Sequence, residues 1–264
     1  MSRDGIISML RERSQPKPGK KHGSRPMGSA PPGTLYVVST PIGDPDDLTI
    51  RALRVLGAVS IIASEDPTAT QALLAHHHAT GTVTSYGPRN LDEKISLLLT
   101  HLGKGQDVAL VSDCGTPVIF DPGCQLINEA HRTGIPVRAV PGPSALTAAM
   151  AISGYSGDAL LFEGRVPPPG NSLKTFLATL RKERRTMVFF AASHRLTRML
   201  TALHKVCPTR RITIARDLTK PEERIVRGTP KVLLKDRRRL QKRAEVTVVI
   251  EGLYSKDQPK TRPR

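Results

Sequence analysis

The sequence contains no tryptophan, and its aromatic residues are only four Tyr and five Phe. Recognition of nucleic acid through a row of stacked bases depends on aromatic side chains, so this composition argues against it. The three cysteines, Cys114, Cys124 and Cys207, are odd in number and lack the CxxC spacing of a zinc site. A disulfide framework and a structural metal are therefore both disfavoured, and no metal is expected.

Long apolar runs are also missing from this chain. No stretch approaches the roughly 20 apolar residues of a membrane span, and the apolar patch at residues 6–10 is shorter than the core of a signal peptide. The glycine-rich motifs of dinucleotide and P-loop nucleotide sites are absent too. We therefore expect a cytoplasmic protein with no membrane partner.

Positive charge is abundant and unevenly distributed. The chain has 40 Lys and Arg against 23 Asp and Glu, a net charge of +17. Residues 34–158 carry seven basic and twelve acidic side chains, whereas residues 159–264 carry 26 and nine. This segregation predicts a small-ligand region followed by a region that binds a polyanion, the alternative being a merely solvated basic surface.

Apolar, β-branched runs alternate with helical patterns from residue 34 onward. Strands are predicted at residues 34–39, 60–63, near 83, 107–112, 136–140, 159–163, 187–191, 211–215 and 246–250. Helices are predicted from about residue 47, capped by Asp46 or Asp47, and at residues 71–76, 90–102, 122–132, 173–180, 194–206 and 230–239. The alternation predicts two α/β domains, the first with a mainly parallel sheet and the second with a mixed sheet.

The predicted organisation has four parts. Residues 1–33 are rich in Pro, Gly, Ser, Lys and Arg, and we expect a disordered basic tail. A nucleic-acid-binding arm and an organellar presequence are the functional alternatives for this tail, and Met27 is a second possible start. An N-terminal cofactor-binding domain is predicted over residues 34–156, a basic C-terminal domain over 157–254 and a short tail over 255–264.

Loops rich in Gly and Pro follow three predicted strands of the first half. They lie at residues 40–44, at 113–117 with a continuation to 121–123, and at 141–145. The carboxyl ends of parallel strands meet at one edge of a sheet, where ligands bind, and glycine lets the main chain approach a ligand closely. A small-molecule site is therefore predicted at this edge.

Four motifs carry a resemblance to a known family. They are LYVVSTPIG at residues 35–43, ALVSDCGTP at 109–117 with DPG at 121–123, VPGPSAL at 140–146, and ARDLTKPEE at 215–223. In this order and spacing they resemble the tetrapyrrole-methylase-like family of S-adenosylmethionine-dependent methyltransferases, and within it the branch that modifies small-subunit ribosomal RNA. The resemblance extends from residue 35 to about residue 252.

The resemblance implies a fold, a cofactor, a substrate and a set of site residues. Family members bind S-adenosylmethionine in a cleft between two α/β domains and act as homodimers. The implied substrate is the ribose 2′-hydroxyl of a cytidine in 16S rRNA, presented as rRNA or as a ribosomal subunit. The positions implied to bind the cofactor are Pro41, Gly43, Asp113, Gly115, Thr116, Ile119, Pro141, Gly142, Ser144 and Ala145.

Methyl transfer to a hydroxyl needs alignment of the reacting atoms and a group that accepts the hydroxyl proton. Glu65 and Asp66 follow the second predicted strand and are our candidates for this catalytic base. Asp66 has an alternative role as the N-cap of the next helix.

Electrostatic contacts should dominate RNA binding. Basic residues cluster at 181–185, 210–211 and 235–243, and among them residues 237–239 are expected to give nonspecific attraction. The best individual RNA-binding candidates are Arg195, Arg216 and Lys220.

Several features keep other interpretations open. The tract His76 to His78 resembles a metal site, but consecutive helical residues point in different directions, which makes a shared site improbable. The sequence departs from the family pattern at Pro67 and Thr68, at Gly87 and Pro88, and at residues 190–193. The alternatives to rRNA methylation are therefore methylation of a tetrapyrrole or another small molecule, and a ribosome-associated binding protein of low activity.

Overall fold

The structure is a computed structural model that describes residues 31–88, 90–167, 171–235 and 243–253. The predictions for residues 1–30 and 254–264, including disorder, an RNA-binding arm and a presequence, lie outside the described residues, as do the cations at residues 236–242. Gly33, at the end of the predicted tail, donates its N–H to the Leu102 carbonyl at 2.8 Å. Residue 33, which the prediction assigned to the tail, therefore contacts the first domain.

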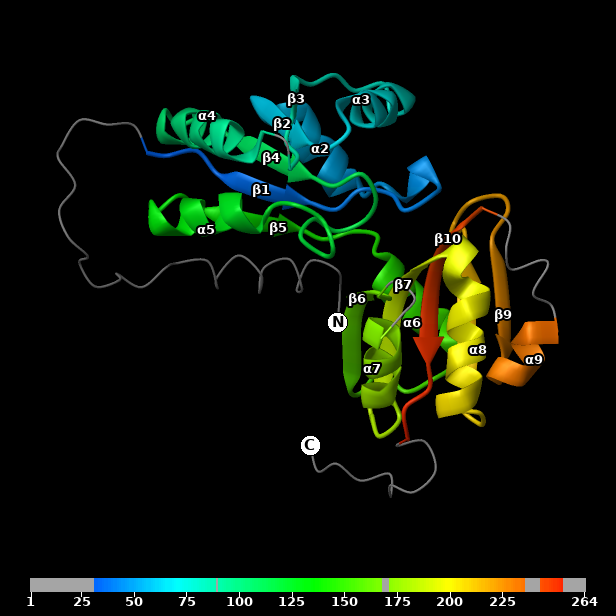
Figure 1. Ribbon diagram of the computed structural model, residues 1–264. Coiled ribbons are helices and arrows are strands. Elements are labelled where there is room, and N and C mark those ends of the chain that lie inside the picture. The colour runs from blue at the N-terminus through cyan, green and yellow to red at the C-terminus, as the bar shows by residue number, and fades with distance from the viewer. Residues whose placement is uncertain (1–30, 89, 168–170, 236–242, 254–264) are drawn as a thin grey trace, which may run out of the picture. The chain divides into compact units, whose positions relative to one another are not determined.

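The first half of the chain forms a five-stranded sheet whose strand pairs are all parallel, as predicted. Its order is β3-β2-β4-β1-β5 (Figure 1). The strands are β1 (Leu35–Val38), β2 (Ile61–Ser64), β3 (Val83–Ser85), β4 (Val108–Val111) and β5 (Val137–Val140). The helices are α2 (Ile50–Ala58), α3 (Pro67–His76), α4 (Leu91–Gly103) and α5 (Cys124–Arg132).

Helices cover both faces of this sheet. Side chains of α4 and α5, such as Leu98 and Leu126, pack with Leu110 of β4 in one buried cluster. The neighbouring strand residue Ala109 belongs to a second cluster with Leu56 of α2. Successive strand residues thus point to opposite faces of the sheet. Because helices cover both faces, these strands are continuous apolar runs.

The predicted cap of the first helix is wrong. Pro45–Asp47 form a short 3-10 helix, η1, in which Asp44 accepts a hydrogen bond from the Asp46 N–H at 3.0 Å. Leu48 then has an extended backbone, and Thr49 caps α2 through a 3.1 Å bond from the Ala52 N–H. Pro45 at the start of η1 begins a separate turn, so the acidic pair lies one element too early to cap α2.

The second half forms a mixed five-stranded sheet in the order β6-β7-β10-β8-β9, which confirms the predicted sheet type. Its strands are β6 (Leu160–Arg165), β7 (Thr186–Ala192), β8 (Ile212–Arg216), β9 (Arg224–Gly228) and β10 (Glu245–Ile250). Only the β6–β7 pair is parallel among them. Strand β9 is not among the predicted strands; it forms an edge of the sheet and, in the part of the chain that the structure describes, pairs with β8 alone.

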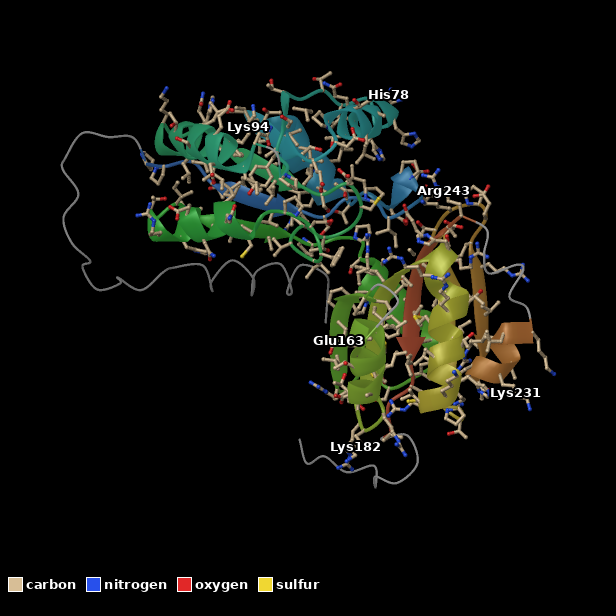
Figure 2. The ribbon with its side chains drawn as sticks, in the orientation of Figure 1. His78, Lys94, Glu163, Lys182, Lys231 and Arg243 are labelled. Atoms are coloured by element: carbon tan, nitrogen blue, oxygen red, sulfur yellow. The ribbon has the colours of Figure 1, made fainter. Side chains whose placement is uncertain are left out.

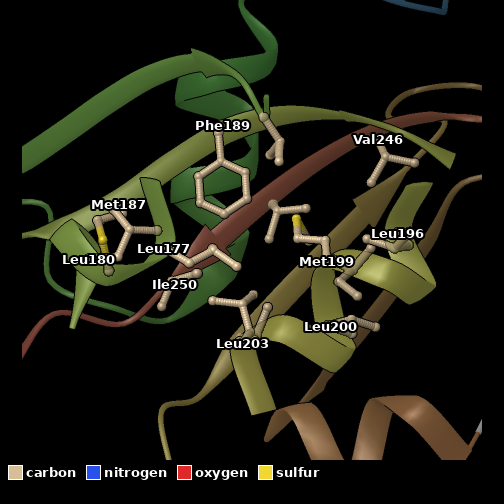
Figure 3. Close-up of a cluster of buried hydrophobic side chains, with 14 of the residues drawn as sticks. Leu177, Leu180, Met187, Phe189, Leu196, Met199, Leu200, Leu203, Val246 and Ile250 are labelled. Atoms are coloured by element: carbon tan, nitrogen blue, oxygen red, sulfur yellow. The ribbon is translucent and has the colours of Figure 1, made fainter. Parts of the chain in front are cut away.

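Two helical layers enclose the second sheet. The first contains η2 (Ser193–Arg195), α7 (Asn171–Leu180), α8 (Leu196–Val206) and α9 (Pro230–Lys235). Phe189 of β7, Leu177 of α7 and Leu203 of α8 meet in its buried cluster (Figure 3). On the other face lies α6 (Ala145–Ser153), whose Ala149 packs with Val188 and Val249.

Helix α6 links the halves of the chain. It directly follows the loop after β5 of the first sheet, yet its buried residues pack with the second sheet. The domain limits 34–156 and 157–254 stay a prediction. None of the helices in the described ranges combines the length and apolar character needed to cross a bilayer.

Candidate active site

A cavity of about 340 Å³ is lined by loops of the first half and by strands of the second. This volume lies in the range of small-molecule sites. From the first half the lining residues are Ile42, Cys114, Gly115, Thr116, Ile119, Phe120, Asp121, Ser144 and Ala145. From the second half they are Arg165, Phe190, Ala191, Ala192, Ala215, Leu218, Ala244, Glu245, Val246 and Thr247.

Hydrogen bonds join the three Gly/Pro loops of the first half. Thr40 and Gly115 form an antiparallel bridge between the loops after β1 and β4. The Thr116 hydroxyl lies 2.9 Å from the Ser39 hydroxyl and donates to the Pro143 carbonyl at 3.2 Å. The loops therefore meet at the carboxyl edge of the parallel sheet, as the strand pattern predicts.

A second junction joins the loop after β1 to the turn after β8. A Cβ on Gly43 would lie 2.5 Å from the Leu218 carbonyl oxygen, so only glycine fits there. The Thr219 hydroxyl accepts a 2.9 Å hydrogen bond from the Asp44 N–H. Gly43 thus has a packing role that its motif alone does not reveal.

The structure divides the predicted cofactor positions among three places. Gly115, Thr116, Ile119, Ser144 and Ala145 line the cavity. Other members of the set line a hollow beside α3 that shares Ile42 and Cys114 with the cavity: Pro41, Gly43 and Asp113. The remaining two are exposed in the loop before α6: Pro141 and Gly142. The cofactor role of all ten stays a prediction.

Asp121 places a carboxyl group in the cavity lining. Burial, together with the negative charges of Glu65 and Asp113, raises its pKa to about 6, although a hydrogen bond with Ser112 and the charge of Arg165 oppose the shift. A carboxylate with a pKa near neutrality is well suited to accept a proton. Asp121 is not among the residues predicted from the sequence, although it begins the DPG motif.

The predicted catalytic pair lies outside the cavity lining. Both side chains are exposed, and Asp66 caps α3 by accepting hydrogen bonds from the N–H groups of Thr68 and Ala69 at 2.9 and 3.1 Å. Its own N–H donates to Asp113 at 2.9 Å. Partial burial and the nearby Asp113 charge raise the pKa of Glu65. The capping alternative for Asp66 is confirmed, and catalysis by either residue stays a prediction.

The three predicted RNA contacts lie in different surroundings. Arg195 lines a small hollow with Arg165 and Arg198, and this hollow shares Arg165, Ala191 and Ala192 with the cavity. Arg216 is only 5% exposed, which leaves its guanidinium little surface for a phosphate. Lys220 forms a 3.0 Å ion pair with Glu245.

Other cations of the basic half also have structural partners. Arg185 pairs with Glu183 at 2.9 Å, and Arg211 pairs with Glu251. Lys182, Lys231 and Arg243, which Figure 2 labels, are exposed. The net charge of this half therefore combines structural cations with a surface open to an anionic partner.

The histidine tract does not diverge as expected. The rings of His76 and His77 lie 4.9 Å apart, and both approach η1. His76 Nε2 lies 2.8 Å from Asp46, and His77 Nε2 lies 2.9 Å from the Pro45 carbonyl. These contacts tie the end of α3 to η1, and they bring ligand atoms of Asp46, His76 and His77 within 4.8 Å of one another.

Comparisons with known proteins agree with this architecture. Residues 34–233 match the tetrapyrrole (corrin/porphyrin) methylases. Ribosomal RNA small subunit methyltransferase I of Thermotoga maritima is 40% identical over 220 residues, covering 83% of this chain and 99% of that protein. The protein of the same name from Xylella fastidiosa is 38% identical over 232 residues, covering 87% and 85%.

Solved structures share the fold at lower identity. A cobalt precorrin-4 methyltransferase has a TM-score of 0.62 at 23% identity, covering 83% of this chain and 94% of that one. A uroporphyrin-III C-methyltransferase from Thermus thermophilus, complexed with S-adenosyl homocysteine, has a TM-score of 0.57 at 21% identity, covering 84% and 98%. This chain belongs to the tetrapyrrole methylase family, and within it to the ribosomal RNA small subunit methyltransferase I group.

Proposed function

We propose that this methyltransferase holds S-adenosylmethionine in the cavity and methylates the ribose 2′-hydroxyl of a cytidine in small-subunit rRNA. The observation that carries the proposal is the Asp121 carboxyl, whose pKa is about 6, in the lining of a cavity adjoined by an arginine-lined hollow. The relatives named ribosomal RNA small subunit methyltransferase I support rRNA as the substrate class.

The residues present fit the cofactor. Ile42, Leu218 and Ala215 offer apolar surface for a planar base, and Thr116 and Ser144 offer hydroxyl groups. The φ of Gly115 is +89°, a conformation that brings main chain rather than a side chain to the lining. When bound, S-adenosylmethionine supplies a methyl group already activated by the sulfonium.

The protein then has two tasks at the acceptor hydroxyl. The cavity walls must hold the 2′-oxygen in line with the methyl group and keep competing water out. Asp121 accepts the hydroxyl proton on its carboxylate, and the pKa of about 6 leaves this carboxylate ionised at neutral pH.

The arginines around the adjoining hollow supply the polyanion site. Arg165, Arg195 and Arg198 offer guanidinium groups, which pair with phosphate through two parallel hydrogen bonds. A ribose inside the cavity would have its flanking phosphates near these groups, so the nucleotide has to leave its base stack to react. Homodimer assembly and a cytoplasmic location remain part of this proposal.

Methyl transfer with labelled S-adenosylmethionine tests the proposal. Purified protein is incubated separately with small ribosomal subunits, naked small-subunit rRNA and uroporphyrinogen III, and the labelled position is mapped. We expect label on a cytidine 2′-oxygen, and loss of that label in Asp121→Asn. Label in the tetrapyrrole alone, or on a base rather than a ribose, contradicts the proposal.

A further inference from the structure

Aromatic side chains are scarce in this protein, yet three of its five phenylalanines meet beside the cavity. The ring of Phe190 lies 5.2 Å from that of Phe162 and 6.4 Å from that of Phe120, edge to face in both pairs. Phe120 and Phe190 line the cavity. Phe120 is 51% exposed, so packing in the folded protein uses only part of its ring.

The loop that carries Phe120 has an unfavourable backbone conformation. Val118 has φ +75° and Phe120 has φ +70°, in the left-handed region that β-branched and bulky residues avoid. Such conformations persist where the surrounding structure enforces them, and they cluster at ligand sites. Here the strained backbone positions a half-exposed aromatic ring in the cavity lining.

The neighbouring strand β6 is shaped around this ring. Gly164 has φ +64°, and a Cβ on it would lie 3.2 Å from the Phe120 ring. The next residue, Arg165, places its guanidinium carbon 4.9 Å from the centre of the Phe120 ring. This contact coincides with a register shift in the β6–β7 pairing between Phe162 and Arg165. Irregularities in strand pairing redirect side chains, and they are frequent next to binding sites.

The surroundings of the ring indicate the class of its ligand. Asp121 follows Phe120 directly, so a group that reacts at the Asp121 carboxylate lies near the ring. Arg165 faces both the cavity and the hollow that contains Arg195 and Arg198. An aromatic face, a guanidinium plane and further cations together suit a planar base that carries a sugar and phosphates.

We propose that Phe120 and Arg165 together form a stacking surface, called the clip below, for the nucleobase of the nucleotide that is methylated. The base stacks on the exposed side of this pair, because the ring and the guanidinium already lie in contact, 4.9 Å apart. This inference rests on the proposed function, because it names the part of the RNA substrate that enters beside Asp121. Stacking on a ring is sequence-tolerant, so the clip positions the base while other contacts select it. The small number of aromatic residues then fits recognition of one unstacked base rather than of a row of stacked bases.

The test compares Phe120→Ala, Phe120→Trp and Arg165→Gln with the unmodified protein. Methylation of small subunits gives KM and kcat, and calorimetry gives the affinity for S-adenosylhomocysteine. A lost stacking contact should raise KM in Phe120→Ala by about 5- to 150-fold. We expect Phe120→Trp to keep the original KM, Arg165→Gln to raise it, and cofactor-product affinity to change less than about twofold in all three.

Ile50→Ala serves as the matched control, because Ile50 is a 70% exposed apolar residue on α2. An unchanged KM in Phe120→Ala overturns the clip, as does an equal loss of S-adenosylhomocysteine affinity, which would assign the ring to the cofactor. If the unmodified protein binds S-adenosylhomocysteine but methylates no rRNA, the proposed function itself fails and the clip with it. If the unmodified protein methylates rRNA and Phe120→Ala keeps the same KM, the proposed function stands and only the clip is contradicted.

Discussion

Thr40 and Gly115 exchange two backbone hydrogen bonds, of 2.9 and 3.1 Å, although 75 residues separate them. Each follows a strand of the parallel sheet, and Gly115 also lies in the cavity lining. Because Gly115 has φ +89°, its N–H and carbonyl can face Thr40 while no side chain enters the cavity. The bridge therefore holds Gly115, and with it one part of the cavity lining, in place in the protein without a ligand.

Replacing Gly115 with alanine should strain this bridge. The new Cβ would lie 3.3 Å from the Ile42 side chain, on a backbone that L-residues rarely adopt. We expect Gly115→Ala to lower the free energy of unfolding by about 1 to 2 kcal/mol and to weaken binding of S-adenosylhomocysteine. Denaturant unfolding and calorimetry measure the two effects.

Gly57→Ala is the control for this substitution. Gly57 lies inside α2, and a Cβ there would meet nothing within 4 Å. Alanine should therefore raise stability by about 0.5 to 1 kcal/mol through its helix propensity and leave ligand affinity unchanged. A Gly115→Ala protein that binds the ligand normally would place the cofactor elsewhere.

Asp121→Asn should separate stability from activity. The raised pKa of Asp121 means that its negative charge at neutral pH lowers the free energy of unfolding. Removing the charge should increase the free energy of unfolding at pH 7 by about 1 kcal/mol, after allowance for solvent screening of a partly buried group. Methyl transfer should fall by about 100-fold because the proton acceptor is lost.

Asp92→Asn is the matched control, since Asp92 is exposed in the first turn of α4. It should leave methyl transfer unchanged. Full activity in Asp121→Asn would return the catalytic role to the two candidates from the sequence, Glu65 and Asp66.

The pH dependence follows from the same carboxyl group. Asp121 works as a base only when it is ionised, so kcat/KM should rise with pH through a midpoint of about 6 and level off above that midpoint. The stability term has the opposite sign: between about pH 6 and the ordinary value of 3.8, only the folded state holds the proton, so this group favours folding more as pH falls.

Glu65→Gln tests the electrostatic origin of that pKa. The Glu65 charge helps to raise the pKa of Asp121, so its removal should shift the midpoint of the activity profile to lower pH. The activity plateau should remain, because Glu65 lies outside the cavity lining. A lost plateau with an unmoved midpoint would identify Glu65 itself as the base.

The sequence predicted those elements that carry a clear local signal. The apolar runs of β1, β2 and β4 are buried on both faces, so composition alone marks them as parallel strands. Helix α6 was missed because seven of its nine residues are apolar, which removes the polar face that a periodicity search needs. Strand β9 was missed because its sequence, RIVRG, has little apolar content and its place depends on pairing with β8.

The site shows a similar division. Glycines and hydroxyl residues of the motifs correctly predicted the edge of the sheet at which the loops meet. This was possible because the backbone conformation of a turn restricts the residue types at nearby positions. The roles of Asp121 and Phe120 depend on distant partners: Glu65 lies 56 positions from the former, and Arg165 lies 45 positions from the latter. Such pairings arise when separate elements pack together in the fold. The spacing of residues along a single sequence does not reveal which of them will meet.

Arg210 is a cation of the basic half whose role is structural. It is 7% exposed and donates hydrogen bonds to the carbonyls of Arg181, Glu183 and Glu251 at 3.0, 2.7 and 3.3 Å. Arg210→Met would leave these three carbonyls without their donors and should cost about 2 to 4 kcal/mol in the free energy of unfolding. Arg138→Met, on the exposed side of β5, should cost less than about 0.5 kcal/mol in the same measurement.

Arg195 and Arg198 should instead contribute to RNA affinity. Each phosphate contact releases condensed counterions, so affinity falls with salt in proportion to the number of contacts. The double variant Arg195→Gln with Arg198→Gln should bind small-subunit rRNA more weakly and reduce the slope of log affinity against log salt by about 1 to 2.

Its control is Arg132→Gln on α5, where the arginine pairs with Glu129 at 2.7 Å on the first half of the chain. That variant should keep the original slope, and both variants should keep the affinity for S-adenosylhomocysteine. An equal slope in the double variant and the unmodified protein would show that the phosphates bind elsewhere. In that case the exposed cations labelled in Figure 2, Lys182, Lys231 and Arg243, are the next to be replaced, because their charges face solvent rather than the cavity.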